Sequence, residues 1–165
     1  MNNEDITILI PSYQPDPHLY NVCSELYKGG YQILIIDDGS GEDYLNIFSS
    51  CNKMAKIIHK PQNQGKGAAL KDGFKQILDL YPNTKYIVTC DGDGQHKYED
   101  IERVIKLARC DKKSVLSMRD FKGKIPLRSR VGNDMSKFVQ TLITSYYCLY
   151  YKFIIICWKF CTTSF

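Results

Sequence analysis

The chain has 165 residues, of which 44% are hydrophobic and 24% are charged, and its net charge at pH 7 is +4. This length and composition are typical of one folded domain with a sizeable core, and they exclude an intrinsically disordered chain. Residues 1–5 lack the basic and apolar segments of a secretory signal, and no apolar run of about 18 residues near the start predicts a membrane helix, so we expect a cytoplasmic protein.

Predicted strands and helices alternate along the chain. Short apolar runs rich in β-branched residues predict the strands, and apolar residues three or four positions apart predict the helices. Their order is strand 6–10, helix 17–28, strand 33–36, helix 44–48, strand 56–59, a helix that opens at 64–67 and ends before Pro82, strand 86–90, helix 98–109 and strand 114–117. This alternation predicts an α/β sandwich with a mostly parallel sheet, because parallel strands need long crossover connections.

Polar motifs follow three of the predicted strands. They are Pro11-Ser12-Tyr13, Asp37-Asp38-Gly39-Ser40 and Asp91-Gly92-Asp93. Ligands of open parallel sheets bind beyond the carboxyl ends of the strands. We therefore expect the three motifs to converge on one edge of the sheet, which indicates a site more strongly than any single motif does.

The segment Asp91–Gln95 is the candidate metal site. Asp91 and Asp93 repel each other unless a cation or a proton lies between them. Oxygen ligands favour Mg²⁺ or Mn²⁺, and Gln95 could add a carbonyl oxygen. Gly92 allows the backbone to approach a ligand closely. Aspartate and glycine are also ordinary turn residues, so these residues alone leave a metal site and a solvated turn equally favoured.

The remaining polar segments also have two interpretations each. The Asp38 carboxylate could accept a hydrogen bond from a base or a ribose, although a turn followed by a helix cap explains the motif as well. Tyr13 could stack on a base. Residues 63–67 could hold a phosphate at a helix N-terminus, with Lys66 adding positive charge, or could form a plain loop.

Other familiar signatures are absent or incomplete. The sequence has no P-loop, and Gly65-x-Gly67 lacks the third glycine of a dinucleotide fingerprint. Asp91 and the residues after it imitate a calcium loop, but His96 occupies the position of the required glycine. A phosphatase with Asp91 as its nucleophile remains an alternative.

The ordered set of motifs resembles the inverting family 2 glycosyltransferases of the GT-A fold, and within them the bacterial relatives of dolichyl-phosphate mannosyltransferase. The similar segments lie within residues 5–143. They are Ile10-Pro11-Ser12-Tyr13, Ile36-Asp37-Asp38-Gly39-Ser40, residues 63–70 (NQGKGAAL), residues 91–96 (DGDGQH), Ser117-Met118-Arg119-Asp120 and residues 128–133 (RSRVGN). The resemblance implies a GT-A, Rossmann-like sandwich that is incomplete at the C-terminus.

The resemblance also implies a role for each matching position in a donor site. Pro11, Tyr13 and Asp38 would contact the nucleoside of a UDP- or GDP-sugar. Asp91, Asp93 and Gln95 would hold Mg²⁺ or Mn²⁺ and, through it, the donor diphosphate, beside Lys66 and Gly92. Arg119 and Arg130 would meet donor or acceptor phosphates. No residue of the sequence is marked as the catalytic base.

The acceptor implied by the resemblance is a polyprenyl phosphate at the inner face of the membrane. Residues 112–165 hold ten Lys or Arg and two Asp, a local charge of +8 that suits an anionic acceptor. We expect no nucleic-acid partner. The expected activity is metal-dependent, inverting transfer of a sugar from the nucleotide sugar to this acceptor, and the alternatives are a nucleotide-sugar-binding remnant with impaired catalysis and the phosphatase.

The C-terminal segment departs from the family pattern. We expect a donor-binding domain over residues 1–145 and an atypical aromatic and cysteine-rich tail over 146–165, left by a truncation or a frameshift. A membrane-contacting tail is the competing interpretation, since aromatic residues and lysine suit an interface. The chain's seven cysteines include no C-x-x-C pair, which predicts free and mostly buried thiols.

Overall fold

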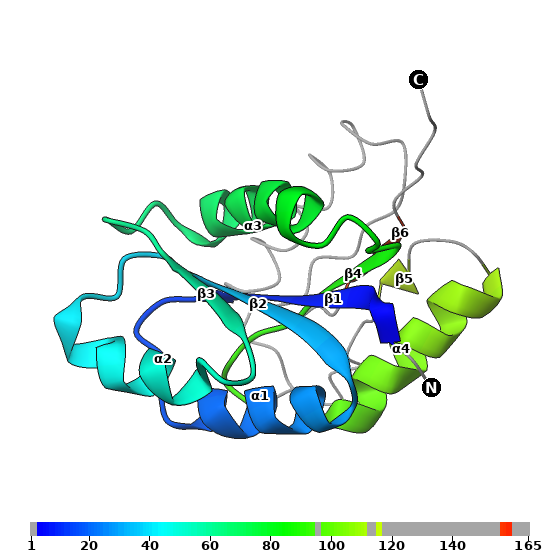
Figure 1. Cartoon of the computed structure of the whole chain (residues 1–165), viewed down its shortest axis with the longest axis horizontal. Helices are drawn as coiled ribbons and strands as arrows, with labels where there is room; N and C mark the ends of the chain where they lie inside the picture. The colour runs from blue at the N-terminus through cyan, green and yellow to red at the C-terminus, as the bar shows by residue number, and fades with distance from the viewer. Residues whose placement is uncertain (1–2, 95–96, 112–114, 117–155, 160–165) are drawn as a thin grey trace, which may run out of the picture. The chain divides into compact units, whose positions relative to one another are not determined.

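The computed structural model describes residues 3–94, 97–111, 115–116 and 156–159 (Figure 1). Its elements are β1 (Asn3–Ser12), α1 (His18–Lys28), β2 (Tyr31–Asp37), the 3-10 turn η1 (Glu42–Tyr44), α2 (Leu45–Cys51), β3 (Lys56–His59), α3 (Lys66–Leu80), β4 (Tyr86–Thr89), α4 (Tyr98–Asp111), β5 (Val115–Leu116) and β6 (Ile156–Lys159). The predicted alternation of strands and helices is confirmed for every element up to β5.

The described strands form one sheet in the order β3-β2-β1-β4-β6-β5. β1 pairs in parallel with β2 and with β4, and β2 pairs in parallel with β3. The chain therefore builds outward from β1 in one direction as far as β3 and then crosses to the other side of β1 to form β4. Such a reversal of strand order creates a crevice at the carboxyl ends of the central strands, where ligands bind in open α/β sheets.

Helices cover both faces of the sheet, with α3 on one face and α1, α2 and α4 on the other (Figure 1). Alternate residues of β1 feed the two cores. Ile6, Ile8 and Ile10 are buried with the larger group of helices, whereas Leu9 is buried beneath α3. This double burial explains why the central strands are continuous apolar runs, and it confirms the predicted α/β sandwich.

Gly73 lets α3 lie close to the sheet. A Cβ atom added at Gly73 would lie 2.4 Å from a methyl carbon of Leu9 and 3.2 Å from Ile36. The helix therefore packs closely on β1 and β2, and any side chain at this position would force Leu9 to shift. At the start of α3, Gly65 N–H contacts Asp38 and Lys66 contacts Asp91, which places both residues at the carboxyl edge of the sheet.

The predicted bounds of the first strand, 6–10, are too narrow, because β1 runs from Asn3 to Ser12 and so continues through Pro11. The Leu9 carbonyl accepts a hydrogen bond from Cys90 N–H, and the Ser12 carbonyl accepts one from Asp38 N–H. The backbone groups of alternate residues thus point to opposite neighbouring strands, and those of Pro11 point to the same side as those of Leu9, toward β4. The last pair between β1 and β4 is Leu9 with Thr89, so Pro11 lies beyond the end of this pairing. Its missing N–H costs no ladder hydrogen bond there.

Strand β6 was not predicted from the sequence. Residues 156–159 pair antiparallel with β4 and with β5, so the sheet carries one antiparallel member among parallel strands. Four residues of the predicted tail therefore belong to the sheet. The proposed domain boundary near residue 145 lies outside the described residues and stays a prediction.

The described cysteines are free, as predicted. Cys23, Cys51 and Cys90 are buried and Cys110 is exposed. Burial raises the pKa of the Cys90 thiol to about 12, so this thiol, next to Asp91, stays protonated and chemically inert. None of the helices in the described ranges has the length and the apolar composition of a membrane span.

Candidate functional site

Two adjoining pockets open at the carboxyl ends of β1, β2 and β4. Both are lined by Pro11, Ser12 and Tyr13 of the segment that ends β1. The first pocket has a volume of about 280 Å³, and its other lining residues are Asp38, Asn63, Gly65, Lys66 and Ala69. The second has a volume of about 240 Å³, and its other lining residues are Gln14, Pro15, Asp16, Asp91, Gly92 and Asp93. The predicted convergence of the three polar motifs is therefore present.

Asp37 organises the turn that follows β2. Its Oδ1 accepts hydrogen bonds from the backbone N–H of Ser40, at 2.9 Å, and from the Ser40 hydroxyl. Its Oδ2 lies 2.7 Å from Nδ1 of His59. The Ser40 hydroxyl oxygen in turn accepts a hydrogen bond from Gln14 N–H at 2.8 Å. The loop after β1, which presents Tyr13, is thereby tied to the loop after β2.

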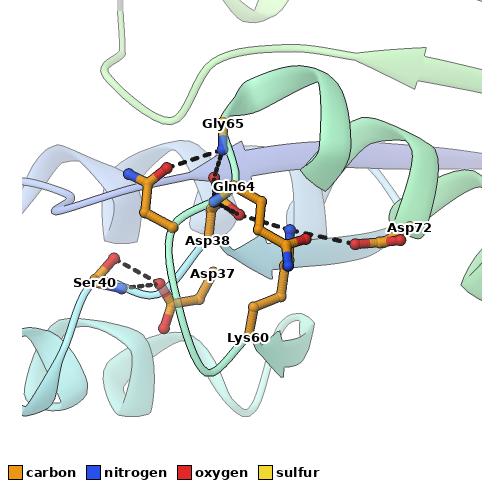
Figure 2. A network of polar contacts seen from close by, with 8 residues as sticks. Asp37, Asp38, Ser40, Lys60, Gln64, Gly65 and Asp72 are labelled. Carbon is orange, nitrogen blue, oxygen red and sulfur yellow. Dashed lines mark hydrogen bonds and ion pairs between the residues drawn. The ribbon is translucent and has the colours of Figure 1, made fainter.

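Asp38 lies in the wall of the first pocket and is almost completely buried. Its carboxylate accepts the backbone N–H groups of Gly65, at 2.6 Å, and of Gln64, at 3.2 Å (Figure 2). Burial acts to raise the pKa of Asp38, but the contacts from Lys60 and from the two amides outweigh it and hold this pKa below its ordinary value. Asp38 is therefore an ionised hydrogen-bond acceptor at neutral pH.

Asp91 and Asp93 lie just beyond β4 and line the second pocket. Gly92 between them packs against the core, because a Cβ atom there would lie 2.8 Å from Leu19 of α1. The Lys66 ammonium lies 2.6 Å from Oδ1 of Asp91 and also lines the first pocket. One lysine thus links the pocket of Asp38 to the pocket of the two aspartates.

The donor set at Asp91 and Asp93 fits a divalent cation that also binds a phosphorylated ligand. A cationic group, the Lys66 ammonium, already contacts Asp91. Over the described part of the chain, no three His, Cys, Asp or Glu side chains gather into a closed metal cage. Mg²⁺ is commonly held by one or two carboxylates, with water and ligand phosphates completing its shell. Two carboxylates at the edge of an open pocket match that arrangement.

The structure brings seven of the predicted site residues to the two pockets: Pro11, Tyr13, Asp38, Lys66, Asp91, Gly92 and Asp93. Tyr13 is about half exposed and lines both pockets, so its ring is accessible to a ligand. Gln95, Arg119 and Arg130 lie outside the described residues, and their roles stay predictions. Sequence reasoning missed Lys60, which contacts Asp38; a charged residue directly after a predicted strand was the available signal.

Comparisons with known proteins show what the chain is similar to. A family model described as Glycosyl transferase family 2 matches residues 7–162. The UDP-N-acetylglucosamine–dolichyl-phosphate N-acetylglucosaminyltransferase of Methanococcus voltae is 31% identical over 89% of the chain and 66% of that protein. The dolichyl-phosphate beta-glucosyltransferase of Saccharomyces cerevisiae is 27% identical over 90% of the chain and 47% of that protein. The chain thus spans less than two thirds of the length of these relatives.

Solved structures share the fold at low sequence identity. Glucosyl-3-phosphoglycerate synthase from Mycobacterium tuberculosis, in complex with uridine-diphosphate, has a TM-score of 0.63 and 13% identity over 93% of the chain and 56% of that protein. A mannosyltransferase from Pyrobaculum calidifontis, in complex with GDP-Man and Mn²⁺, has a TM-score of 0.57 and 13% identity over 73% of the chain and 38% of that protein. These likenesses show the GT-A fold. Because the family model matches nearly the whole chain, the chain belongs to glycosyl transferase family 2.

Proposed function

We propose that the chain is the donor-binding part of a metal-dependent, inverting glycosyltransferase that moves a sugar from a UDP- or GDP-sugar to a polyprenyl phosphate. The observation that carries this proposal is the pair of adjoining pockets, with Asp38 in one and the Asp91–Asp93 pair in the other, joined through Lys66. Membership of the family removes the basis for the alternative in which Asp91 is a phosphatase nucleophile.

The first pocket would hold the nucleoside. The half-exposed Tyr13 ring offers a stacking surface, and the ionised Asp38 carboxylate offers an acceptor for a base N–H or a ribose hydroxyl. Loop positions are held by hydrogen bonds from Gln14 to Ser40 and from Gly65 to Asp38. The pocket is thus ordered before a ligand arrives, which lowers the entropic cost of binding.

The second pocket would hold the diphosphate. A bound divalent cation would neutralise the charge that develops on the nucleoside diphosphate as it leaves. Asp91 and Asp93 would hold this cation with Gln95, which lies outside the described residues. The Lys66 ammonium, on a side chain that is 57% exposed, is free to turn from Asp91 toward a phosphate oxygen when the cation takes its place.

The acceptor part of the proposal is supported by the named relatives and by charge. The relatives from Methanococcus voltae and Saccharomyces cerevisiae are named for transfer to dolichyl phosphate. The local charge of +8 over residues 112–165 would attract such an anionic acceptor to a membrane surface.

A nucleotide screen by thermal unfolding tests the proposal. We expect UDP or GDP with Mn²⁺ to stabilise the chain, by about 2.7 kcal/mol at a hundredfold excess over the dissociation constant. ADP with Mn²⁺ is the control and should stabilise it less. Equal unfolding temperatures with and without all nucleotides would contradict the proposal. Nucleotide binding without transfer to a polyprenyl phosphate would favour the donor-binding remnant instead.

Replacing Lys66 with methionine is expected to change metal binding and nucleotide binding in opposite directions. Without nucleotide, Mn²⁺ should bind about two- to fivefold more tightly, a small gain because the Lys66–Asp91 pair is partly exposed to solvent. With Mn²⁺ present, the affinity for UDP or GDP should fall about tenfold, because a phosphate loses a charge-assisted contact. The Mn²⁺ electron paramagnetic resonance signal and calorimetry measure the two affinities.

The matched control for this variant is Lys75→Met, since Lys75 is an exposed lysine on the same helix. It should leave both affinities unchanged. A Lys66→Met variant whose two affinities move in the same direction would show that Lys66 does not exchange between the carboxylate and the phosphate.

A further inference from the structure

Lys60 contacts the candidate site through Asp38, and most of its side chain is covered by the protein. It follows β3 directly, and its side chain is only 10% exposed. Its ammonium lies 2.7 Å from Oδ1 of Asp38 and 3.3 Å from Oδ2 of Asp72, as ion-pair contacts rather than well-aligned hydrogen bonds. Figure 2 shows the ammonium between these two carboxylates.

The contacts of Lys60 join three elements around one carboxylate. Asp38 follows β2, Lys60 follows β3, and Asp72 lies on α3. The backbone N–H of Lys60 also donates to the Asp37 carbonyl at 2.8 Å. The lysine backbone is therefore held by β2, and its side chain fixes one oxygen of Asp38.

Three protein groups hold both oxygens of the Asp38 carboxylate. A carboxylate has about four acceptor positions on its two oxygens. The Gln64 N–H lies 3.2 Å from both oxygens of Asp38, the Gly65 N–H donates to Oδ2, and the Lys60 ammonium forms an ion pair with Oδ1. The carboxylate is thus held on its protein side while it still lines the pocket shared with Tyr13.

We propose that Lys60 is a positioning residue for nucleotide binding: it fixes the Asp38 carboxylate in the pocket wall and keeps it charged for a base N–H or a ribose hydroxyl. This inference rests on the proposed function. Lys60 does not line either pocket, so its effect on a nucleotide passes through Asp38.

The charge balance around Asp38 explains why the lysine is needed. Burial acts to raise the pKa of Asp38, and the largest opposing effect is the contact with Lys60. The contact with Asp38 is likewise the largest cause of the raised pKa of Lys60. Other charged or titratable groups also lie near Asp38. Tyr13, after β1, and Lys66, on α3, line the same pocket. Asp72 on α3 contacts Lys60, and His59 at the end of β3 contacts the neighbouring Asp37.

Replacing Lys60 with methionine is therefore expected to weaken UDP or GDP binding about tenfold at neutral pH. The pH at which nucleotide affinity is lost on acidification should also change. In the unaltered chain the pKa of Asp38 is held below its ordinary value, so Asp38 stays charged to a lower pH than an unpaired aspartate does. Without the lysine, burial raises this pKa, so affinity should be lost at a higher pH as the solution is acidified. Calorimetry between pH 4.5 and pH 8 would measure both effects.

Two single variants serve as comparisons. Lys60→Arg keeps the charge and should retain affinity to within about threefold and keep the pH profile. Lys56→Met removes an exposed lysine of β3, the strand that Lys60 follows, and should change neither the affinity nor the pH profile. Lys60→Arg could instead lose as much nucleotide affinity as Lys60→Met, and lose it at the same raised pH. The charge of Lys60 would then not be what matters, and the inference would be overturned.

A double variant keeps the test decisive even if Lys60→Met folds poorly. Asp38→Asn with Lys60→Met leaves no unpaired buried charge, so it avoids the main cost of the single change. If Lys60 acts through Asp38, this double variant should bind the nucleotide as Asp38→Asn does. A further loss of affinity in the double variant would overturn the inference.

The outcomes separate this inference from the proposed function. An unaltered chain that binds no nucleotide would overturn both. An unaltered chain that binds UDP or GDP, together with a Lys60→Met variant of equal affinity at every pH, would overturn the inference about Lys60 alone.

Discussion

Replacing Asp91 with asparagine is expected to weaken Mn²⁺-dependent binding of UDP or GDP by about 100-fold or more. Loss of a group behind a metal ligand typically costs ten- to 100-fold in metal affinity, and Asp91 would be a ligand itself. Asparagine preserves the shape of the side chain but removes the negative charge that attracts the cation. The variant should fold normally, because Asp91 lies at the rim of an open pocket. Calorimetry with and without Mn²⁺ measures the loss.

Asp79→Asn is the matched control, since Asp79 is an exposed aspartate on α3. It should bind the nucleotide as tightly as the unaltered chain does. The residual affinity of Asp91→Asn should no longer depend on Mn²⁺. An Asp91→Asn variant that keeps the full metal-dependent affinity would show that this aspartate is not a metal ligand.

Replacing Gly39 with alanine is expected to destabilise the chain by about 3 kcal/mol or more. Gly39 has φ = +76°, a backbone conformation that costs other residues about 1–2 kcal/mol. In addition, a Cβ atom there would lie 2.4 Å from the Gln62 carbonyl carbon and 2.6 Å from Asn63 N. These are backbone atoms, so the loop before α3 would have to move. Urea unfolding measures the change in the free energy of unfolding.

Gly30→Ala separates the two causes, because Gly30 has the same φ of +76° with nothing within 4 Å of an added Cβ atom. It should cost only about 1 kcal/mol. Gly39→Ala should also weaken nucleotide binding, since the displaced loop carries the Gly65 N–H that holds Asp38. Equal losses of stability in the two variants would show that the close approach of the loops contributes nothing.

The elements of the fold are predictable from sequence because each one repeats a local pattern. The continuous apolar runs around Ile8 and Leu34 predict strands that are buried on both faces, and both strands are present. The spacing of Leu19, Cys23 and Leu26 predicts helix α1. Strand β6 could not be predicted, because its pairing with β4 joins residues about 70 positions apart and rests on tertiary context.

The candidate site, like the fold, is predictable from sequence only in part. The aspartates at the ends of two predicted strands, together with Tyr13, identify the edge of the sheet at which a ligand would bind. Their residue types and their place after apolar runs carry this information, because parallel strands present their carboxyl ends together. Sequence by itself therefore determined the α/β class and the sheet edge at which the candidate site lies.

Only the tertiary structure decided what each charge at that site contacts. Lys66 pairs with Asp91, and Lys60 pairs with Asp38, although 25 and 22 positions separate the partners in the chain. Such pairs form because crossover connections return distant residues to the same edge of the sheet, and no local pattern encodes them. The physical reason is burial: once Asp38 leaves water, it remains charged only if the fold supplies donors, and the loops around Lys60 and Gly65 supply them.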